Sequence, residues 1–421
     1  MISRLRSLRG EINFVLSNVL SLGVGLLSSV VAVTFIEPYD LGVINQYMLI
    51  QVYLSFLHLG VFNGLNRNLA YYLAKGETAY VQRLVNCTYT TGAVISFIGF
   101  CVGCALTICS VVTPGDTIHL YASLLLLFLL TAGPLVNALE TTYRSGQQFF
   151  KLGYIKNIEN TIQLVSACLP AVIGAVGKVI SDSLKQIVGL VLRYRHRAYR
   201  YSACGDFRTT VSLIKVGFPI LVTGYLWSVF MACDRTYISI YMGAESLGLY
   251  SLSGYVTTTI MAIPLSINAL LYPKAAAKYG ASNNNHDLFS FWKLSLMLYG
   301  SILLPICIIT YFVLPFIVSY FMPMYQEGIE AAQYSLLTCS TFIYLGPAVI
   351  FGTLRRNFSY IVILCCSILV FWCTCYVFHN RIDNIETVAL IRFIISFIQL
   401  IFILTITYIY VAYEEKSTIL R

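Results

Sequence analysis

Ten long stretches of this chain contain no Asp, Glu, Lys or Arg, and this feature restricts the fold more than any other. A helix needs about 20 mostly apolar residues to cross the hydrocarbon core of a bilayer. Each stretch reaches that length or comes close to it: 12–36, 41–66, 84–115, 117–139, 160–177, 246–273, 294–326, 331–354, 357–380 and 393–413. Two further apolar stretches, 179–192 and 213–242, contain a few charged residues. They raise the expected number of membrane-spanning helices to about twelve. The sequence therefore predicts an all-α integral membrane protein.

The basic residues between these stretches predict the topology. When successive gaps are assigned alternately to the two sides of the membrane, 22 of the 27 Lys and Arg residues fall on one side. Short loops rich in Lys and Arg stay in the cytoplasm. We therefore expect a multi-pass protein with both termini cytoplasmic. Because topology explains the net charge of +9, no nucleic-acid partner is expected.

Several other functions are disfavoured by the motifs. The first apolar stretch follows Arg4, Arg6 and Arg9, but it is too long for a signal peptide and has no small-residue cleavage site, so a mature helix is expected. Most of the 13 cysteines lie inside apolar stretches, where Cys behaves as a small hydrophobe, and their spacing does not supply a ligand set for a metal. No phosphate-binding loop of the Walker type occurs. We therefore expect no metal, no cofactor and no ATP hydrolysis.

A basic segment close to the middle of the chain divides it into two halves. It predicts three parts: a first six-helix lobe over 1–192, a cytoplasmic linker over 193–212, and a second six-helix lobe over 213–421. A shift of 206 positions aligns Asp40-Leu-Gly-Val43 with Ser246-Leu-Gly-Leu249, each in the outer turn after the first helix of its half. Both halves begin on the same side, so they form a parallel repeat. Two such lobes are the geometry of an alternating-access transporter.

The start of the second half contains the most specific motifs. These are Leu213-Ile-Lys-Val-Gly-Phe-Pro219, Trp227, Asp234-Arg235 and Gly243-Ala-Glu-Ser-Leu-Gly-Leu-Tyr250, echoed in the first half by Tyr39-Asp-Leu-Gly42 and Gly64-Leu-Asn-Arg67. In these motifs the chain resembles polysaccharide exporters of the Wzx type. They belong to the multidrug/oligosaccharidyl-lipid/polysaccharide (MOP) exporter superfamily, which also contains lipid II flippases and the MATE drug antiporters.

This resemblance implies a function. It implies a flippase of the bacterial inner membrane that moves undecaprenyl-pyrophosphate-linked oligosaccharide, such as an O-antigen or capsule repeat unit, to the periplasmic leaflet. It also implies a polysaccharide polymerase and a chain-length regulator as partners.

Such a transporter needs a polar cavity for the headgroup of its substrate. In the second apolar stretch Gln51, Ser55, His58 and Asn66 have the spacing of one helical face. Tyr255 lies in the corresponding stretch of the second half. These residues are therefore candidates for the cavity wall.

Charged residues inside membrane spans are costly and indicate function. Thr223, Trp227 and Asp234 share a helical face, which makes Asp234 the first candidate for the cavity. Glu140 and Arg144 are four residues apart and can pair on one helix. Guanidinium groups bind phosphate oxygens in a bidentate manner. The candidates for binding the pyrophosphate are Arg67, Arg144, Arg235 and Arg392.

The sequence leaves three questions open. H⁺ or Na⁺ could drive transport, with Asp234, Glu140 or Glu159 as the binding carboxylate. A MATE-type drug antiporter is the alternative, although arginines inside the spans disfavour a cationic cargo. A membrane polysaccharide polymerase is the third candidate, but every outer loop here is short and nearly free of Arg and His. A transporter that is not an enzyme is therefore expected.

Overall fold

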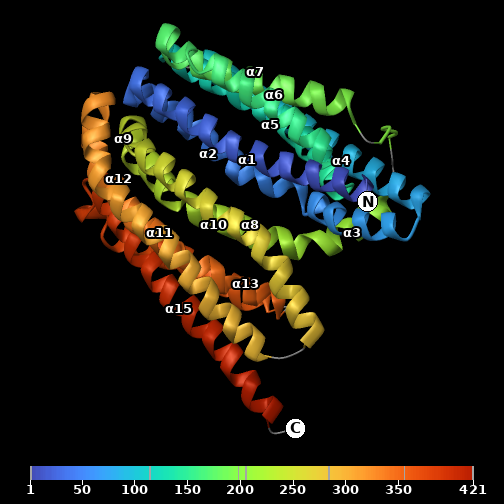
Figure 1. Cartoon of the computed structure of the whole chain (residues 1–421). Coiled ribbons are helices and arrows are strands. Elements are labelled where there is room, and N and C mark those ends of the chain that lie inside the picture. Colours follow the sequence, from blue (N-terminus) through green and yellow to red (C-terminus); the bar gives the residue numbers. More distant parts are fainter. Residues whose placement is uncertain are drawn as a thin grey trace. The chain divides into compact units, whose positions relative to one another are not determined.

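The computed structural model describes residues 2–112, 115–197, 199–203, 206–282, 285–354 and 356–419. Throughout these residues the chain forms α-helices and short 3-10 helices without any β-strand, in agreement with the all-α prediction. The chain divides into two compact units, Met1–Tyr225 and Leu226–Arg421 (Figure 1). The boundary between the two units lies inside the helix Phe207–Tyr241. The division into two lobes and a linker that the charge pattern predicts stays a prediction.

The first unit is a bundle of helices that starts with a long N-terminal helix. Its elements are α1 (Ile2–Phe35), α2 (Pro38–Leu54), η1 (Ser55–His58), α3 (Val61–Ala74), α4 (Thr78–Val112), α5 (Thr117–Ser145), α6 (Phe149–Ser166), α7 (Leu169–Arg195) and the first part of α8 (Phe207–Tyr241). α1 packs on α6, α4 packs on α5, and α5 packs on α7. Ser17 and Ser21 of α1 donate hydrogen bonds to Gly153 and Asn160 of α6, so small polar residues of α1 serve helix packing.

The helix predicted over 41–66 is broken. Leu59 (φ 45°) and Gly60 (φ 86°) adopt the left-handed conformation, and the chain bends by 50° between α2–η1 and α3. The prediction of one polar face is therefore wrong for Asn66, which lies beyond the break. Gly60 is required there because a Cβ atom would collide with the backbone of Gly217 and Phe218 in α8.

The same crossing of α3 and α8 gives a test of packing. A Cβ atom on Gly64 would collide with the carbonyl oxygen of Leu213, whereas a Cβ atom on Gly25 of α1 would meet nothing within 4 Å. We expect Gly64→Val to lower the free energy of unfolding by about 1–3 kcal/mol through overpacking. Thermal unfolding of the purified protein in detergent would measure this, with Gly25→Val as the matched control. Equal unfolding temperatures for the two variants would contradict the close crossing.

The boundaries predicted for the fifth and sixth spans are wrong. The sequence predicts spans over 160–177 and 179–192, but α6 covers Phe149–Ser166 and α7 covers Leu169–Arg195. α6 begins earlier because charged side chains that resemble loop residues in the sequence are held inside the unit by ion pairs. α7 begins beside Pro170, which suits the first turn of a helix, and bends at Ile173 and Gly174.

α8 begins directly after an N-cap formed by Asp206. The backbone and side chain of Thr209 donate hydrogen bonds of 3.2 and 2.6 Å to the Asp206 carboxylate. These hydrogen bonds stabilise the ionised form and lower the pKa of Asp206. From this cap α8 continues through Pro219 into the second unit.

The second unit contains the rest of α8 and the helices that follow it. These elements are α9 (Gly243–Leu249), α10 (Ser251–Ser282), α11 (Asn285–Phe321), η2 (Pro323–Gly328), α12 (Ile329–Thr341), η3 (Phe342–Tyr344), α13 (Leu345–Thr353), α14 (Asn357–Val377), η4 (His379–Arg381) and α15 (Ile385–Ile419). The stretch predicted as one helix over 331–354 is divided into α12, η3 and α13. Pro347, in the first turn of α13, cannot donate a backbone hydrogen bond to the preceding turn, which favours a break there.

The two units repeat the same order of helix packing. In the first unit α4 packs on α5, α5 on α7, and α6 on α7. In the second unit α11 packs on α12, α12 on α15, and α14 on α15. α1 and α8 are both long helices, and each is followed by a tight turn. This pattern agrees with the predicted repeat of two lobes.

Eight helical segments among the described residues are long and apolar enough to cross a membrane, and the bent pair α2–α3 would add a ninth. The chain is therefore a multi-pass membrane protein. α6 and α7 contain several Lys, Arg, Asp and Glu residues, which lowers their apolar character. The predicted number of twelve spans stays a prediction.

Candidate functional site

A buried polar site lies inside the second unit and takes its side chains from α8, α10, α12 and α15. It surrounds a small cavity of about 10 Å³. Asp234 of α8 is 9% exposed, and Arg392 of α15 is 3% exposed. The rest of the lining is Met231, Arg235, Tyr250, Ser253, Gly254, Thr257, Ser335 and Thr338. A cavity of this size holds at most a water-sized group, so the site is closed in this conformation.

The carboxylate of Asp234 is held by hydrogen bonds, without an ion pair among the described residues. The hydroxyl of Tyr250 donates to one oxygen at 2.8 Å, and the backbone N–H of Arg235 donates to the other at 2.8 Å. Hydrogen bonds of this kind satisfy a buried carboxylate, but they leave its charge without a paired cation. The Asp234 carboxylate is therefore held by a phenol and a backbone N–H, and no ion pair among the described residues fixes it.

Arg392 is a buried cation with neutral partners. Its guanidinium lies 3.6 Å from the ring centre of Phe230, donates to the carbonyl of Phe230 at 2.5 Å, and lies 3.2 Å from the sulfur of Met231. Arg235 also lines the site and donates to the carbonyl of Met231 at 3.3 Å. Two guanidinium groups thus accompany one carboxylate. The site has an excess of positive charge and can attract an anionic group.

The polar character continues along α15. Ser396 and Gln399 lie on the same face of α15 as Arg392, and both are buried. Their side chains, and the hydroxyl of Ser253 on α10, have no hydrogen-bond partner within the described part of the chain. A buried polar group without a partner costs about 1–3 kcal/mol. These groups therefore offer hydrogen bonds to water or to cargo.

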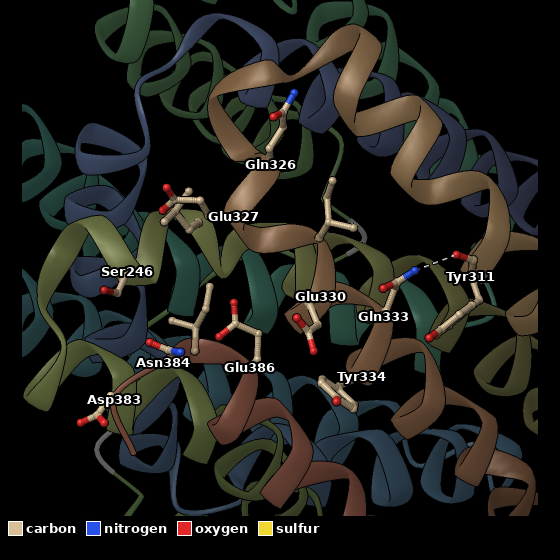
Figure 2. A pocket seen from close by; sticks show the side chains of 13 residues that line it. Ser246, Tyr311, Gln326, Glu327, Glu330, Gln333, Tyr334, Asp383, Asn384 and Glu386 are labelled. Atoms are coloured by element: carbon tan, nitrogen blue, oxygen red, sulfur yellow. Dashed lines mark hydrogen bonds between the residues drawn. The ribbon is translucent and has the colours of Figure 1, made fainter. Parts of the chain in front are cut away.

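A larger pocket of about 570 Å³ lies at one end of the second unit, beside the turns that follow α8, α11 and α14. Figure 2 shows the carboxylates of Glu327, Glu330, Asp383 and Glu386 around one space. The other polar lining residues are Ser246, Tyr311, Gln326, Gln333, Tyr334 and Asn384, and none of the described lining residues is basic. The predicted topology places these turns on the outer side. The pocket repels anions and accepts hydrogen bonds from hydroxyl or amino groups.

A separate pocket of the first unit contains part of the predicted cavity wall. Gln51, Ser55 and His58 line a cavity of about 130 Å³ together with Asn137 of α5. His58 accepts a hydrogen bond from a backbone N–H at 3.1 Å and stacks on the ring of Phe62. The fold thus brings three of the four predicted wall residues of α2–α3 together.

A buried ion network joins α5, α6 and α7 at the end of the first unit where α7 ends. Arg193, 3% exposed, forms ion pairs with Glu159 and with Glu140, the latter at 3.2 Å. The predicted pair of Glu140 and Arg144 is present at 2.7 Å. Lys156 lies 3.5 Å from the same carboxylate. More cations than carboxylates therefore meet in this network.

The other predicted residues lie outside these sites. Trp227 packs in an aromatic cluster with Phe230, Phe342 and Tyr344, with ring centroids 6.3, 6.1 and 6.2 Å away. Tyr255 lies on α10 and lines none of the three pockets. Arg67 is exposed on α3 and is not part of them either.

Sequence reasoning misses Arg193 and the outer carboxylates. The charge pattern treats Arg193 as a cytoplasmic loop charge, although it lies on α7 and is buried. The carboxylates around the large pocket come from two turns and from the starts of the helices that follow these turns. The predicted topology places both turns on the same side of the membrane. Acidic residues in turns that are predicted on the same side could therefore have indicated this pocket. Within the described residues no group of His, Cys, Asp and Glu could hold a metal ion.

Comparison with known proteins identifies the family. The family described as polysaccharide biosynthesis protein matches residues 31–323, which is more than half of the chain. The curated proteins give no match. A multidrug resistance MATE family transporter of the MOP superfamily, in its inward-facing conformation, matches with a TM-score of 0.78 at 12% identity, over 94% of this chain and 96% of that one.

Two further solved structures agree. The outward-facing conformation of a multidrug resistance MATE family transporter gives a TM-score of 0.62 at 13% identity, over 97% of this chain and 96% of that one. The second is a MOP superfamily transporter from Pyrococcus furiosus, for which the reverse polarity of the binding pocket suggests a different function. It matches with a TM-score of 0.63 at 12% identity, over 96% of this chain and 95% of that one. These matches show that the chain shares the two-lobe fold of these transporters. The chain therefore has a fold like that of these MOP superfamily transporters, and it belongs to the polysaccharide biosynthesis protein family.

Proposed function

We propose that this transporter is a flippase for lipid-linked oligosaccharide. Its cargo is undecaprenyl-pyrophosphate-linked oligosaccharide, an O-antigen or capsule repeat unit, which it moves from the cytoplasmic to the periplasmic leaflet of the bacterial inner membrane by alternating access. A polysaccharide polymerase and a chain-length regulator would act on the product. Membership of a polysaccharide biosynthesis family supports this class of cargo.

One observation carries the proposal: the buried site of the second unit has two guanidinium groups and only one carboxylate. A cationic drug would meet repulsion there, whereas a pyrophosphate carries the charge that guanidinium groups bind. The unpartnered groups of Ser253, Ser396 and Gln399 would donate and accept hydrogen bonds once the site opens. The lipid tail can stay in the bilayer while these residues shelter the headgroup.

A MATE-type drug antiporter is the second candidate. The acidic pocket of the second unit favours it, because four carboxylates without a basic neighbour in the described lining attract a cation. The solved structures with this fold include multidrug transporters. The two candidates differ in the sign of the charge on the cargo, so experiment can separate them.

The test is the leaflet in which the lipid-linked sugar accumulates. In cells that lack this chain we expect undecaprenyl-pyrophosphate-linked oligosaccharide to stay in the inner leaflet, inaccessible to a membrane-impermeant probe. The wild-type copy should restore accessibility, and Asp234→Ala should fail to restore it at equal expression. Asp116→Ala, a change at an exposed Asp before α5, is the matched control and should restore it fully.

The opposite outcomes have clear meanings. If the lipid-linked sugar reaches the outer leaflet without this chain, the flippase proposal is wrong. If loss of the chain instead makes cells retain the cationic dye ethidium, the drug antiporter is the better function. If Asp234→Ala rescues as well as Asp116→Ala, the carboxylate of Asp234 is not required for transport.

A further inference from the structure

The broken helix of the first unit contains a side chain that holds the break. η1 ends at His58, Leu59 and Gly60 adopt the left-handed conformation, and α3 begins at Val61. Backbone N–H groups at the start of a helix have no acceptor within that helix. The N–H of Gly60 donates instead to Nδ1 of His58 at 3.1 Å. The two bent parts together are long and apolar enough to cross a membrane, so this contact lies at a break inside a candidate span.

The contact requires a neutral imidazole. A ring nitrogen that accepts a hydrogen bond carries no proton, so the proton of neutral His58 is on Nε2. An imidazolium has a proton on both nitrogens and can only donate. Addition of a proton to Nδ1 therefore excludes the hydrogen bond from Gly60. The same atom cannot hold the break and bind a proton.

The pocket beside His58 provides partners for the protonated ring. This cavity of about 130 Å³ is lined by His58 together with the polar side chains of Gln51, Ser55 and Asn137. It is large enough for water, since one molecule needs about 10–15 Å³ of such volume. Water and the oxygens of these side chains can accept the hydrogen bonds of an imidazolium. Both protonation states of His58 therefore find hydrogen-bond partners.

His58 is the only ionisable side chain in the described lining of this pocket, to which α2, η1, α3, α4 and α5 contribute. Other ionisable side chains on these helices and on α8 lie outside the lining: Tyr53 of α2, Arg67 of α3, Cys101 and Cys104 of α4, Glu140 of α5, and Lys215 and Tyr225 of α8. Glu140 is paired with Arg144. In the pocket a protonated His58 is thus held by hydrogen bonds rather than by a carboxylate, so the proton can leave again.

We propose that His58 is a proton-binding site that controls the break between α2 and α3. In the neutral form Nδ1 accepts the N–H of Gly60 and holds the left-handed turn. A hydronium ion in the pocket transfers one proton to Nδ1 and leaves water behind, and the hydrogen bond from Gly60 is lost. Transfer of the proton from Nδ1 back to water restores that hydrogen bond.

The break is connected to α8 by close contacts. Gly60 and Gly64 lie so near to α8 that a Cβ atom on either residue would collide with its backbone. The ring of Phe56 in η1 contacts the rings of Phe218 and Tyr225, with centroids 6.1 and 4.9 Å away. A change in the bend at residue 60 therefore moves groups that pack directly on α8. Proton binding at the imidazole is thereby linked to the packing of a second helix.

The buried carboxylates are less suited to this task. Glu140 and Glu159 are both paired with the guanidinium of Arg193. The carboxylate of Asp234 already accepts hydrogen bonds from a phenol and a backbone N–H. Histidine is the side chain whose charge ordinarily changes between about pH 5 and 8. His58 therefore combines a titratable ring with a contact that only its neutral form can make.

His58→Asn separates the two roles of the imidazole. The side-chain oxygen of Asn accepts the N–H two residues further on, but it binds no proton at these pH values. Hydrogen exchange of the purified full chain is followed by mass spectrometry at about pH 7.5 and about pH 5.5, on either side of the ordinary pKa of histidine. The rates are corrected for the intrinsic effect of pH on exchange. We expect the wild-type peptide that contains Gly60 to exchange roughly tenfold faster at the lower pH, because one hydrogen bond is lost. His58→Asn should exchange slowly at both.

Two further variants make this result specific. His58→Leu has neither an acceptor nor a proton site, and its peptide should exchange fast at both pH values. His196→Asn, at an exposed histidine after α7, should respond as wild type does. Thermal unfolding shows whether each variant is folded. If the wild-type peptide exchanges equally at both pH values, or if folded His58→Asn responds to pH as wild type does, the proposal is wrong.

The use of this site in transport rests on the proposed function, and the two can fail separately. Vesicles that contain the protein and a fluorescent undecaprenyl-pyrophosphate disaccharide report flipping at the same two pH values. Wild type should flip at different rates, and His58→Asn at equal rates. An exchange response without any flipping would overturn the proposed function and support the proton site. Equal flipping rates of wild type would support the flippase and overturn a role of His58 in its control.

Discussion

Replacing Arg392 by glutamine is expected to reduce flipping of the lipid-linked oligosaccharide by at least roughly tenfold. The change removes a buried guanidinium that contacts a carbonyl, a sulfur atom and an aromatic ring in the second unit. Asp234 and Arg235 would remain, so the site would lose its positive excess. A hydrogen bond to a charged group contributes about 1.5–3 kcal/mol, and its loss from the bound state changes the rate roughly tenfold to a hundredfold. The measurement is the initial rate of flipping in vesicles.

Two companion variants make this result specific. Arg392→Lys retains the charge without the planar fork of the guanidinium, and we expect an intermediate rate. Arg381→Gln removes an exposed cation from η4 in the same unit and should leave the rate unchanged. Thermal unfolding of all three variants controls for misfolding. A folded Arg392→Gln protein that flips at the wild-type rate would exclude this guanidinium from cargo binding.

Replacing Arg193 by methionine is expected to cause the largest loss of stability. Glu140 and Glu159 would stay in place while the guanidinium that holds both is removed. Removal of one partner from a buried ion pair costs about 3–5 kcal/mol, because the remaining charge has no compensation. Arg195→Met, a change at an exposed arginine at the end of α7, should cost much less. Thermal unfolding in detergent gives the comparison.

A second change tests the cause of this loss. If the cost comes from an uncompensated carboxylate, the double variant Arg193→Met with Glu159→Gln should unfold at a higher temperature than Arg193→Met alone. An equal or lower unfolding temperature would assign the cost to lost packing rather than to charge. Lys156 and Arg144 still neutralise Glu140 in both variants, so the comparison isolates Glu159.

Some of the site could be predicted from the spacing within single helices. Glu140 and Arg144 pair because residues four apart face each other on a helix. Gln51, Ser55 and His58 line one pocket for a similar reason. Asn66 does not, because the left-handed conformation at residues 59 and 60 turns α3 away from α2. That break involves a close contact with α8, which is far along the chain, so local spacing could not reveal it.

Arg193 shows the limit of the charge rule. Lys and Arg residues near the ends of membrane-spanning helices are more frequent on the cytoplasmic side, and the rule treats all of them alike. The rule does not predict which of these residues is buried inside the protein. Arg193 is buried because Gly189 leaves space beside it and because Glu140 and Glu159 approach it from two other helices. Arg195, on another side of the same helix end, stays exposed.

The amino-acid sequence alone established a helical membrane protein, and its motifs pointed to the superfamily and to residues whose burial is costly. These conclusions depend on apolar runs and on the order of charges along the chain, which are local properties. Only the tertiary structure decided which polar groups meet: Arg392 meets the carbonyl and ring of Phe230, Asp234 meets Tyr250, and Lys185 meets Gln163. The reason is physical, because such partners come from different helices, and their distance depends on how those helices bend, cross and leave space for one another.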